Sequence, residues 1–143
     1  MEGLPSSAAD QNRVMGSYTK KNLRDVENQA PKFGMPDELD ARFARTPLEG
    51  ESLGLSIMKL DPGFRIPFGH KHAGQEEVYV VVRGSGRVKV EDEVVELREW
   101  DAIRFDTDTM RNMEAGSEGI EYLAFGAGDD PTDAEMSQDW WTD

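Results

Sequence analysis

The sequence predicts an all-β fold, an antiparallel sandwich or barrel, over residues 52–125. Three observations support this prediction. Apolar segments of about four to eight residues follow one another at short intervals. Glycine, proline and acidic residues typical of turns separate these segments. No helical repeat of apolar residues lies between them, as it would in a fold built from parallel strands. Antiparallel strands joined by short turns are the arrangement that this pattern favours.

The chain before this region is expected to hold little regular structure. Residues 1–20 are predicted to be a flexible N-terminal tail, because they are mostly polar and small. Asn22 is expected to cap a single turn of helix. Residues 30–37 contain prolines and a glycine, so they predict an irregular connector. Residues 41–44 are either a short strand or a helix capped by Asp37.

The strands expected after this connector are bounded by turn signals. Their predicted positions are residues 53–60, 77–82, 87–90, 94–95, 102–105, 110–113 and 120–125. The acidic residues at positions 91–93 are expected to form a hairpin turn between two of these strands.

Residues 128–143 are predicted to be a C-terminal tail with a short helix. A capping Asp129 is followed within two residues by Pro131, an order typical of a helix start. The tail ends near Trp140 and Trp141, whose two indoles are a large apolar surface. We expect them to dock the tail onto the barrel or onto a partner subunit.

Composition and charge exclude several classes of function. A chain of 143 residues is expected to form one domain. Its 16 basic and 29 acidic residues give a formal net charge of −13, which repels nucleic acid and anionic membranes, so neither is an expected partner. The chain has no cysteine and therefore no disulfide or thiol chemistry. We see neither a signal peptide nor a membrane span, so the expected location is the cytoplasm.

The two histidines of the chain, His70 and His72, are separated by a single residue. Residues two apart on an extended strand point to the same face, about 7 Å from one another, so both imidazoles can meet at one point. The carboxylates Glu76 and Glu77 follow at the start of the next apolar segment. Imidazole and carboxylate together suit zinc, iron, manganese, nickel or copper. The stretch therefore predicts a site for a divalent transition metal.

This stretch resembles the first motif of the cupins, in which His-x-His precedes a glutamate and then a glycine. Here His70 and His72 are followed by four residues, Glu77, six residues and Gly84. The resemblance implies that Glu77, rather than Glu76, is the carboxylate ligand of the metal. It also implies a double-stranded, jelly-roll-type antiparallel β-barrel over residues 21–127.

The second cupin motif normally supplies a histidine as the fourth metal ligand. The matching frame here is residues 100–115, and Arg111 falls at the histidine position. Since the chain has no third histidine, the resemblance implies three metal ligands, His70, His72 and Glu77. The residues expected to bind a small-molecule ligand in the same cavity are Arg111, Tyr79, Met58 and Met113.

Arg111 leaves two arrangements open. Its guanidinium stays charged at any accessible pH. If it pairs closely with Glu77, that buried carboxylate has a partner without any metal, and we expect little metal binding. If it lies several ångströms away, a metal together with an anionic ligand is the better expectation.

The strand at residues 77–82 has a second apolar face. Val78, Val80 and Val82 point away from the face that carries Glu77 and Tyr79. A strand face in water is normally polar, so we expect this row to be covered. The predicted cover is a second subunit in a homodimer, and the alternative is the N-terminal segment of the same chain.

Three functions follow from these observations. The first is a cupin that binds a divalent metal, a small anionic molecule or both in its barrel. The alternative is a metal-dependent enzyme of the oxygenase or isomerase type that uses a two-His-one-Glu site. The third is a structural interior that is closed by a salt bridge and holds no ligand.

Overall fold

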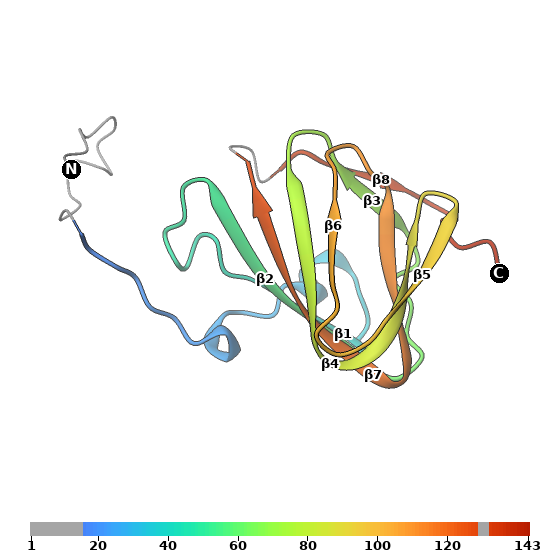
Figure 1. Ribbon diagram of the computed structural model, residues 1–143. Coiled ribbons are helices and arrows are strands. Elements are labelled where there is room, and N and C mark those ends of the chain that lie inside the picture. The colour runs from blue at the N-terminus through green and yellow to red at the C-terminus, as the bar shows by residue number, and fades with distance from the viewer. Residues whose placement is uncertain (1–15, 129–131) are drawn as a thin grey trace.

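The computed structural model describes residues 16–128 and 132–143 and shows a curled antiparallel β-sheet with almost no helix (Figure 1). The described residues form two 3₁₀ turns, η1 (Leu23–Asp25) and η2 (Ala30–Phe33), and eight strands. The strands are β1 (Leu39–Phe43), β2 (Leu53–Leu60), β3 (Gly69–His72), β4 (Glu76–Val90), β5 (Glu93–Leu97), β6 (Ala102–Phe105), β7 (Arg111–Ala127) and β8 (Ala134–Ser137).

The long strands β4 and β7 organise the sheet. They pair with each other antiparallel along most of their length, and both of them continue through a bend. Before the bend β4 also pairs with β6, and after it β4 pairs with β5. On its other edge β7 pairs with β2 and, through a single register pair, with β3, which gives the order β1-β2-β7-β3-β8. Because both long strands bend, the sheet curls round on itself.

The bend depends on two glycines that face each other. The β4–β7 register shifts between Gly84 and Gly86, close to Gly119 on β7. Gly84 has a φ of 76° and Gly119 a φ of 79°, a left-handed region that favours glycine. A side chain at Gly84 would overlap the backbone carbonyl of Gly119, so the two strands approach closely only because this position has no Cβ.

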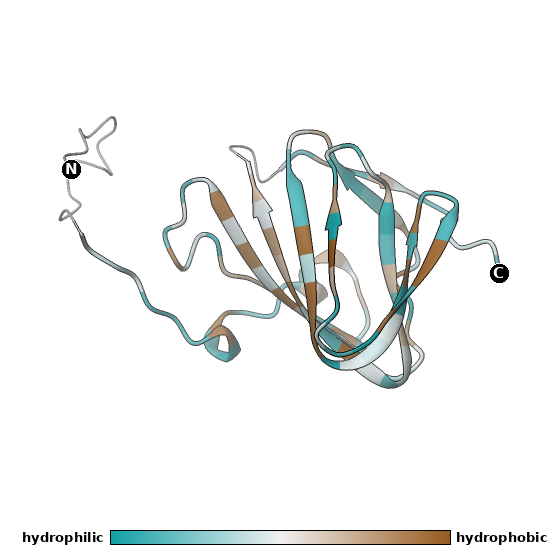
Figure 2. Ribbon diagram, in the orientation of Figure 1, coloured by the Kyte–Doolittle hydropathy of each residue, from teal (hydrophilic) through white to brown (hydrophobic). Residues whose placement is uncertain are grey.

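The core lies inside the curl of the sheet. Tyr79 and Val81 on β4 are almost fully buried, and they belong to one apolar cluster with Phe105 and Tyr122. Figure 2 shows apolar segments interrupted by polar ones along the strands, as a sheet with one inner face requires. The outer valines, at positions 78, 80 and 82, are half-buried in the single chain. The homodimer that would cover them stays a prediction.

The predicted all-β fold is confirmed, and two strands have the expected bounds, β2 and β6. Of the expected segment 41–44, residues 41–43 belong to a strand, β1, and none belongs to a helix. Asn22 caps η1, since its side chain accepts a hydrogen bond from the backbone N–H of Arg24. The strands expected separately at 77–82 and 87–90 form the single strand β4, and those at 110–113 and 120–125 form β7. The glycines between them bend the strands without ending them.

The short C-terminal helix is the part of the fold that the sequence predicts incorrectly for the described residues. Its expected start at residues 129–131 lies outside them, and so does most of the expected N-terminal tail, residues 1–15. The residues that follow form strand β8, which pairs antiparallel with β3. The unpaired backbone groups along the edge of β3 favour this added strand over a short isolated helix.

Both tail tryptophans dock onto the same chain. The Trp140 ring lies over Gly69, where a Cβ would come within 2.6 Å of it, and the Lys89 ammonium lies 3.7 Å from the ring centroid. The Trp141 indole N–H donates to the carbonyl of Ile66 at 2.7 Å. Among the described residues, no helix has the length and apolar character that crossing a membrane requires.

Candidate metal centre

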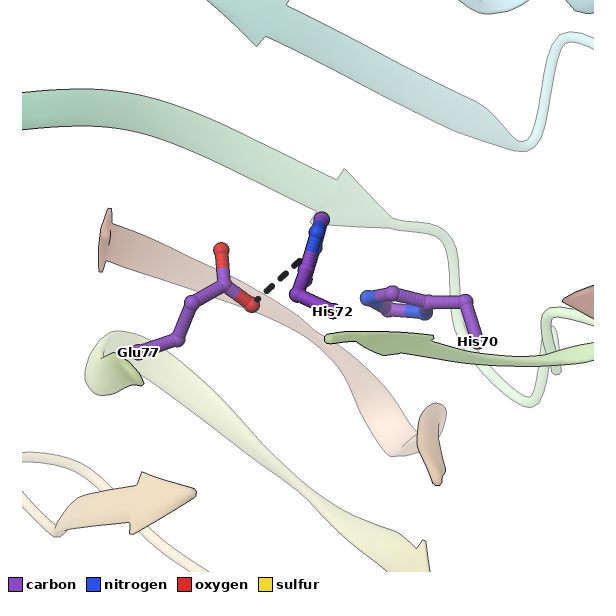
Figure 3. A group of neighbouring side chains, drawn as sticks. All are labelled: His70, His72 and Glu77. Atoms are coloured by element: carbon purple, nitrogen blue, oxygen red, sulfur yellow. Dashed lines mark ion pairs between the residues drawn. The ribbon is translucent and has the colours of Figure 1, made fainter. Parts of the chain in front are cut away.

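Two consecutive strands, which both pair with β7, bring the three predicted metal ligands together. His70 and His72 lie on β3, and Glu77 lies near the start of β4. Each of the three offers one ligand atom, and these atoms all lie within 4.8 Å of one another. Figure 3 shows the Glu77 carboxylate pointing toward the His72 ring, with the His70 ring beside it. The side chain of Glu76, by contrast, forms an exposed ion pair with Arg104.

His72 is held from both sides of its ring. Its Nδ1 lies 2.7 Å from Oδ1 of Asp133, and its Nε2 lies 3.6 Å from Oε1 of Glu77. A carboxylate only accepts hydrogen bonds, so a neutral His72 carries its proton on Nδ1 and donates it to Asp133. The Nε2 lone pair then faces Glu77. This is the tautomer and direction that a metal ligand requires.

Asp133 is itself fixed by three donors. It accepts hydrogen bonds from the backbone N–H of Gly74, from His72 and from the Gln75 amide. Burial acts to raise the pKa of Asp133, but these hydrogen bonds outweigh it, so the pKa lies below its ordinary value. Asp133 is therefore a carboxylate at neutral pH.

His70 is a neutral imidazole at any ordinary pH. Burial, with smaller contributions from the charge of Arg111 and from His72, lowers the pKa of His70 to about 3. Its Nε2 lies 3.4 Å from the Tyr79 hydroxyl. Burial, and then the charge of Glu77, raise the pKa of Tyr79, which keeps it a neutral phenol. The uncharged His70 ring is the form that binds metals.

Arg111 lies beside the three candidate ligands. It is the first residue of β7 and is in register with His70. Its side chain is fully buried, and Nη2 donates a hydrogen bond to Oε1 of Glu77. Nη1 donates to the carbonyl of Thr109 at 2.8 Å, whereas Nε has no hydrogen-bond partner among the described residues. Of the two arrangements left open by the sequence, the structure therefore has the close pairing of Arg111 with Glu77, which is the one for which the sequence predicts little metal binding. A metal at this site therefore requires that Glu77 can bind an ion while it stays paired with Arg111.

The donor types of the three residues suit a divalent metal, and the distance between His72 and Glu77 is already compatible with one ion. Two ligands that each lie about 2.1 Å from one ion are at most about 4.2 Å apart. The 3.6 Å between His72 and Glu77 meets this condition. Glu77 has two oxygens, so one can bind the ion while the other keeps Arg111. Glu77 and Arg111 cancel in charge, and Asp133 adds one negative charge beside His72, so a doubly charged ion leaves the site with one net positive charge. This favours an anion as a further ligand.

Comparisons with known proteins agree with this fold. The family model described as "Cupin domain" matches residues 56–125. A solved cupin protein from Bacteroides fragilis superposes with a TM-score of 0.65 at 24% identity, over 80% of this chain and 86% of that one. The chain belongs to the cupin superfamily. No curated protein sequence matches the chain.

Other solved structures share this cupin fold. KdgF from Halomonas sp. has a TM-score of 0.56 and 19% identity, over 65% of this chain and 82% of that one. Oxalate decarboxylase from Bacillus subtilis has a TM-score of 0.67 and 23% identity, over 84% of this chain. The match covers only 32% of the oxalate decarboxylase chain. At these identities the likeness concerns the fold.

The remaining predicted site residues of this cupin lie in the core. Met113 is fully buried, and Met58 packs against the same cluster as Tyr79. Whether they line a ligand cavity stays a prediction. Two surface hollows, of about 310 and 270 Å³, lie near the bend of β4 and β7, and neither is lined by a predicted site residue.

Asp133 and Gln75 are the site residues that sequence reasoning missed. Gln75 lies between His72 and Glu77 in the sequence, and its side chain is buried. It could have been noticed as a polar residue next to the ligands. Asp133 lies 61 residues from His72 in the sequence and belongs to no motif. Only the pairing of β8 with β3 reveals it.

Proposed function

We propose that this cupin binds a small anionic molecule through a divalent transition metal held by His70, His72 and Glu77. The observation that supports this most is the grouping of three ligand atoms within 4.8 Å. Nitrogen and carboxylate donors of this kind suit zinc, iron, manganese, nickel or copper. A solved structure of Bacillus subtilis oxalate decarboxylase concerns the Mn(II) centres of that enzyme, and this supports the proposal of a metal in the same fold.

Arg111 is the reason for an anionic ligand. A buried guanidinium beside a divalent ion repels it, and Glu77 and Asp133 together offset only two of the three positive charges. An anion bound to the metal offsets the remaining charge and can also accept a hydrogen bond from Arg111, whose Nε has no partner among the described residues. Arg111 is thus expected to weaken binding of the bare metal and to strengthen binding of the metal with an anion.

A more specific alternative is that the protein is a metal-dependent enzyme of the oxygenase or isomerase type. A metal with three protein ligands keeps positions open for a substrate, which it polarises as a Lewis acid. Around those positions, His70, His72 and Glu77 would hold the ion. Tyr79 offers a neutral hydroxyl, and Arg111 orients an anionic group.

A metal-free interior is the second candidate, and the Arg111–Glu77 pair favours it. A buried carboxylate with an arginine partner needs no cation. Such a protein would bind a neutral molecule in the barrel or none. Metal titration separates this candidate from the proposed function.

The test is a titration of Zn²⁺ and Mn²⁺ into protein purified without an affinity tag. We expect one site, and we expect His72→Ala and Glu77→Gln each to weaken it by about 100-fold or more, because each removes one of three ligands. Oxalate, used as an anionic probe, is expected to tighten metal binding in the wild-type protein.

The matched control is Glu76→Gln, which makes the same chemical change at the neighbouring carboxylate. Glu76 pairs with Arg104 at the surface, so this variant is expected to bind metal as the wild type does. Equal binding by wild type and Glu77→Gln, or negligible binding by the wild type, would contradict the proposed site.

The assembly and the location of the protein are proposed as well. We infer a homodimer that covers the half-buried outer valines of β4, with a cytoplasmic location. Support for the dimer comes from the apolar row itself, since a strand face in water is normally polar.

A further inference from the structure

We propose that Asp133 is a positioning residue of the metal centre and that the C-terminal segment, residues 132–143, is part of that centre. This inference rests on the proposed metal site. Asp133 does not contact the metal in this proposal. It acts through His72, by fixing which ring nitrogen carries the proton and where the other one points.

The geometry around Asp133 leaves its carboxylate little freedom. Oδ1 accepts from His72 Nδ1 at 2.7 Å and from Gln75 Nε2 at 2.9 Å, and Oδ2 accepts from the N–H of Gly74 at 2.7 Å. The side chains of Asp133 and His72 are only 11% and 12% exposed. Both oxygens are thus held by the loop between β3 and β4, the loop that joins the histidines to Glu77.

Asp133 affects the affinity for the metal through the imidazole ring of His72. In water a free imidazole exchanges its proton between the two nitrogens and rotates. A carboxylate on Nδ1 keeps the proton there, makes Nε2 a better electron donor and stops the rotation. Nε2 then stays 3.6 Å from Glu77, where an ion between them meets both ligands.

The tail carries Asp133 to this position by several independent contacts. β8 pairs with β3 in a register that places Ala134 opposite His72 and Met136 opposite His70. Further along, Trp140 lies against Gly69, and Trp141 is bound to Ile66. The C-terminal segment therefore covers the histidine-bearing strand along its length, with Asp133 at the end nearest Glu77.

A consequence is that metal binding and docking of the tail are linked. A tail that leaves β3 takes Asp133 away from His72 and lowers metal affinity. By reciprocity, a bound metal stabilises the docked tail by the same factor.

The experiment compares Asp133→Ala with the wild type by Zn²⁺ titration and by imidazole ¹⁵N NMR. The expected result is a metal affinity lower by about 10- to 100-fold, the range typical of a lost hydrogen-bond partner of a ligand. The chain has only two histidines, so the spectrum is simple. In the metal-free wild type we expect His72 to be protonated on Nδ1, and in the variant we expect a mixture of both tautomers. A purely structural role in holding the tail would leave the tautomer unchanged.

Two further variants keep the test decisive. Asp133→Asn preserves the shape of the side chain, so folding is retained, but its amide replaces one acceptor by a donor; we expect it to weaken Zn²⁺ binding as well. Glu135→Gln is the matched control. It removes the same charge from an exposed residue two positions along and is expected to change neither affinity nor tautomer.

The outcomes separate the two proposals. Equal Zn²⁺ affinity in the wild type and in Asp133→Ala would overturn the role of Asp133 and leave the metal site standing. A wild-type His72 that is protonated on Nε2 would also overturn it. Negligible Zn²⁺ binding by the wild type would overturn the metal site and this inference with it.

Discussion

Replacing Arg111 by histidine is expected to raise the affinity for a bare divalent metal by about 100-fold or more. The change removes a buried positive charge next to the ion and adds an imidazole in register with His70. A unit charge about 4 Å from another is worth about 4 kcal/mol at an effective dielectric constant near 20, and about 1.4 kcal/mol is tenfold in affinity. The measurement is a competitive Zn²⁺ titration of the wild type and of Arg111→His.

Arg111→Met separates the two causes. It removes the charge without adding a ligand, so we expect its Zn²⁺ affinity to lie between those of the wild type and Arg111→His. In the metal-free state both variants leave Glu77 without its buried partner and lose about 3–5 kcal/mol of stability. Zn²⁺ is expected to restore part of that loss. Variants that bind Zn²⁺ no better than the wild type would show that Arg111 does not oppose the metal.

Gly84→Ala is expected to destabilise the fold by several kcal/mol. The new side chain meets two obstacles, a φ of 76° that costs roughly 1–2 kcal/mol for an L-residue, and overlap with the carbonyl of Gly119 on the facing strand. Because that contact is with backbone, relief requires β4 and β7 to separate at the bend. Urea unfolding followed by circular dichroism measures the effect.

Gly63→Ala is the matched control for this prediction. Gly63 has nearly the same φ, 74°, but a Cβ there has no atom within 4 Å. It should therefore show the cost of the backbone conformation alone, about 1 kcal/mol. If both variants lose the same stability, the close approach of β4 and β7 at Gly84 does not matter to the fold.

Much of the site could be predicted because its signals are local. His70, His72 and Glu77 lie within eight residues, and strand geometry alone places both imidazoles on one side. Arg111 was identified by its place in the second motif, and the structure puts it beside His70 and in contact with Glu77. Sequence spacing does not give the distance between Arg111 and Glu77, so it cannot decide whether the two side chains form a close ion pair.

The parts that were missed depend on long-range contacts. The local pattern of residues 129–133 favours a helix start, whereas β8 forms because β3 has a free edge at that point. Nothing near Asp133 in the sequence indicates that it meets His72. In the same way, the pattern predicts that strands end near Gly84 and Gly119, since it does not show that the two bends lie against each other.

The most direct test of the central claim is the transition-metal content of the wild-type protein purified without an affinity tag, measured by mass spectrometry beside His72→Ala. The account predicts about one divalent ion per chain in the wild type, as one three-residue site allows. It predicts little in the variant. A wild-type protein that carries no transition metal above background, even after exposure to Zn²⁺ and Mn²⁺ followed by desalting, would contradict it.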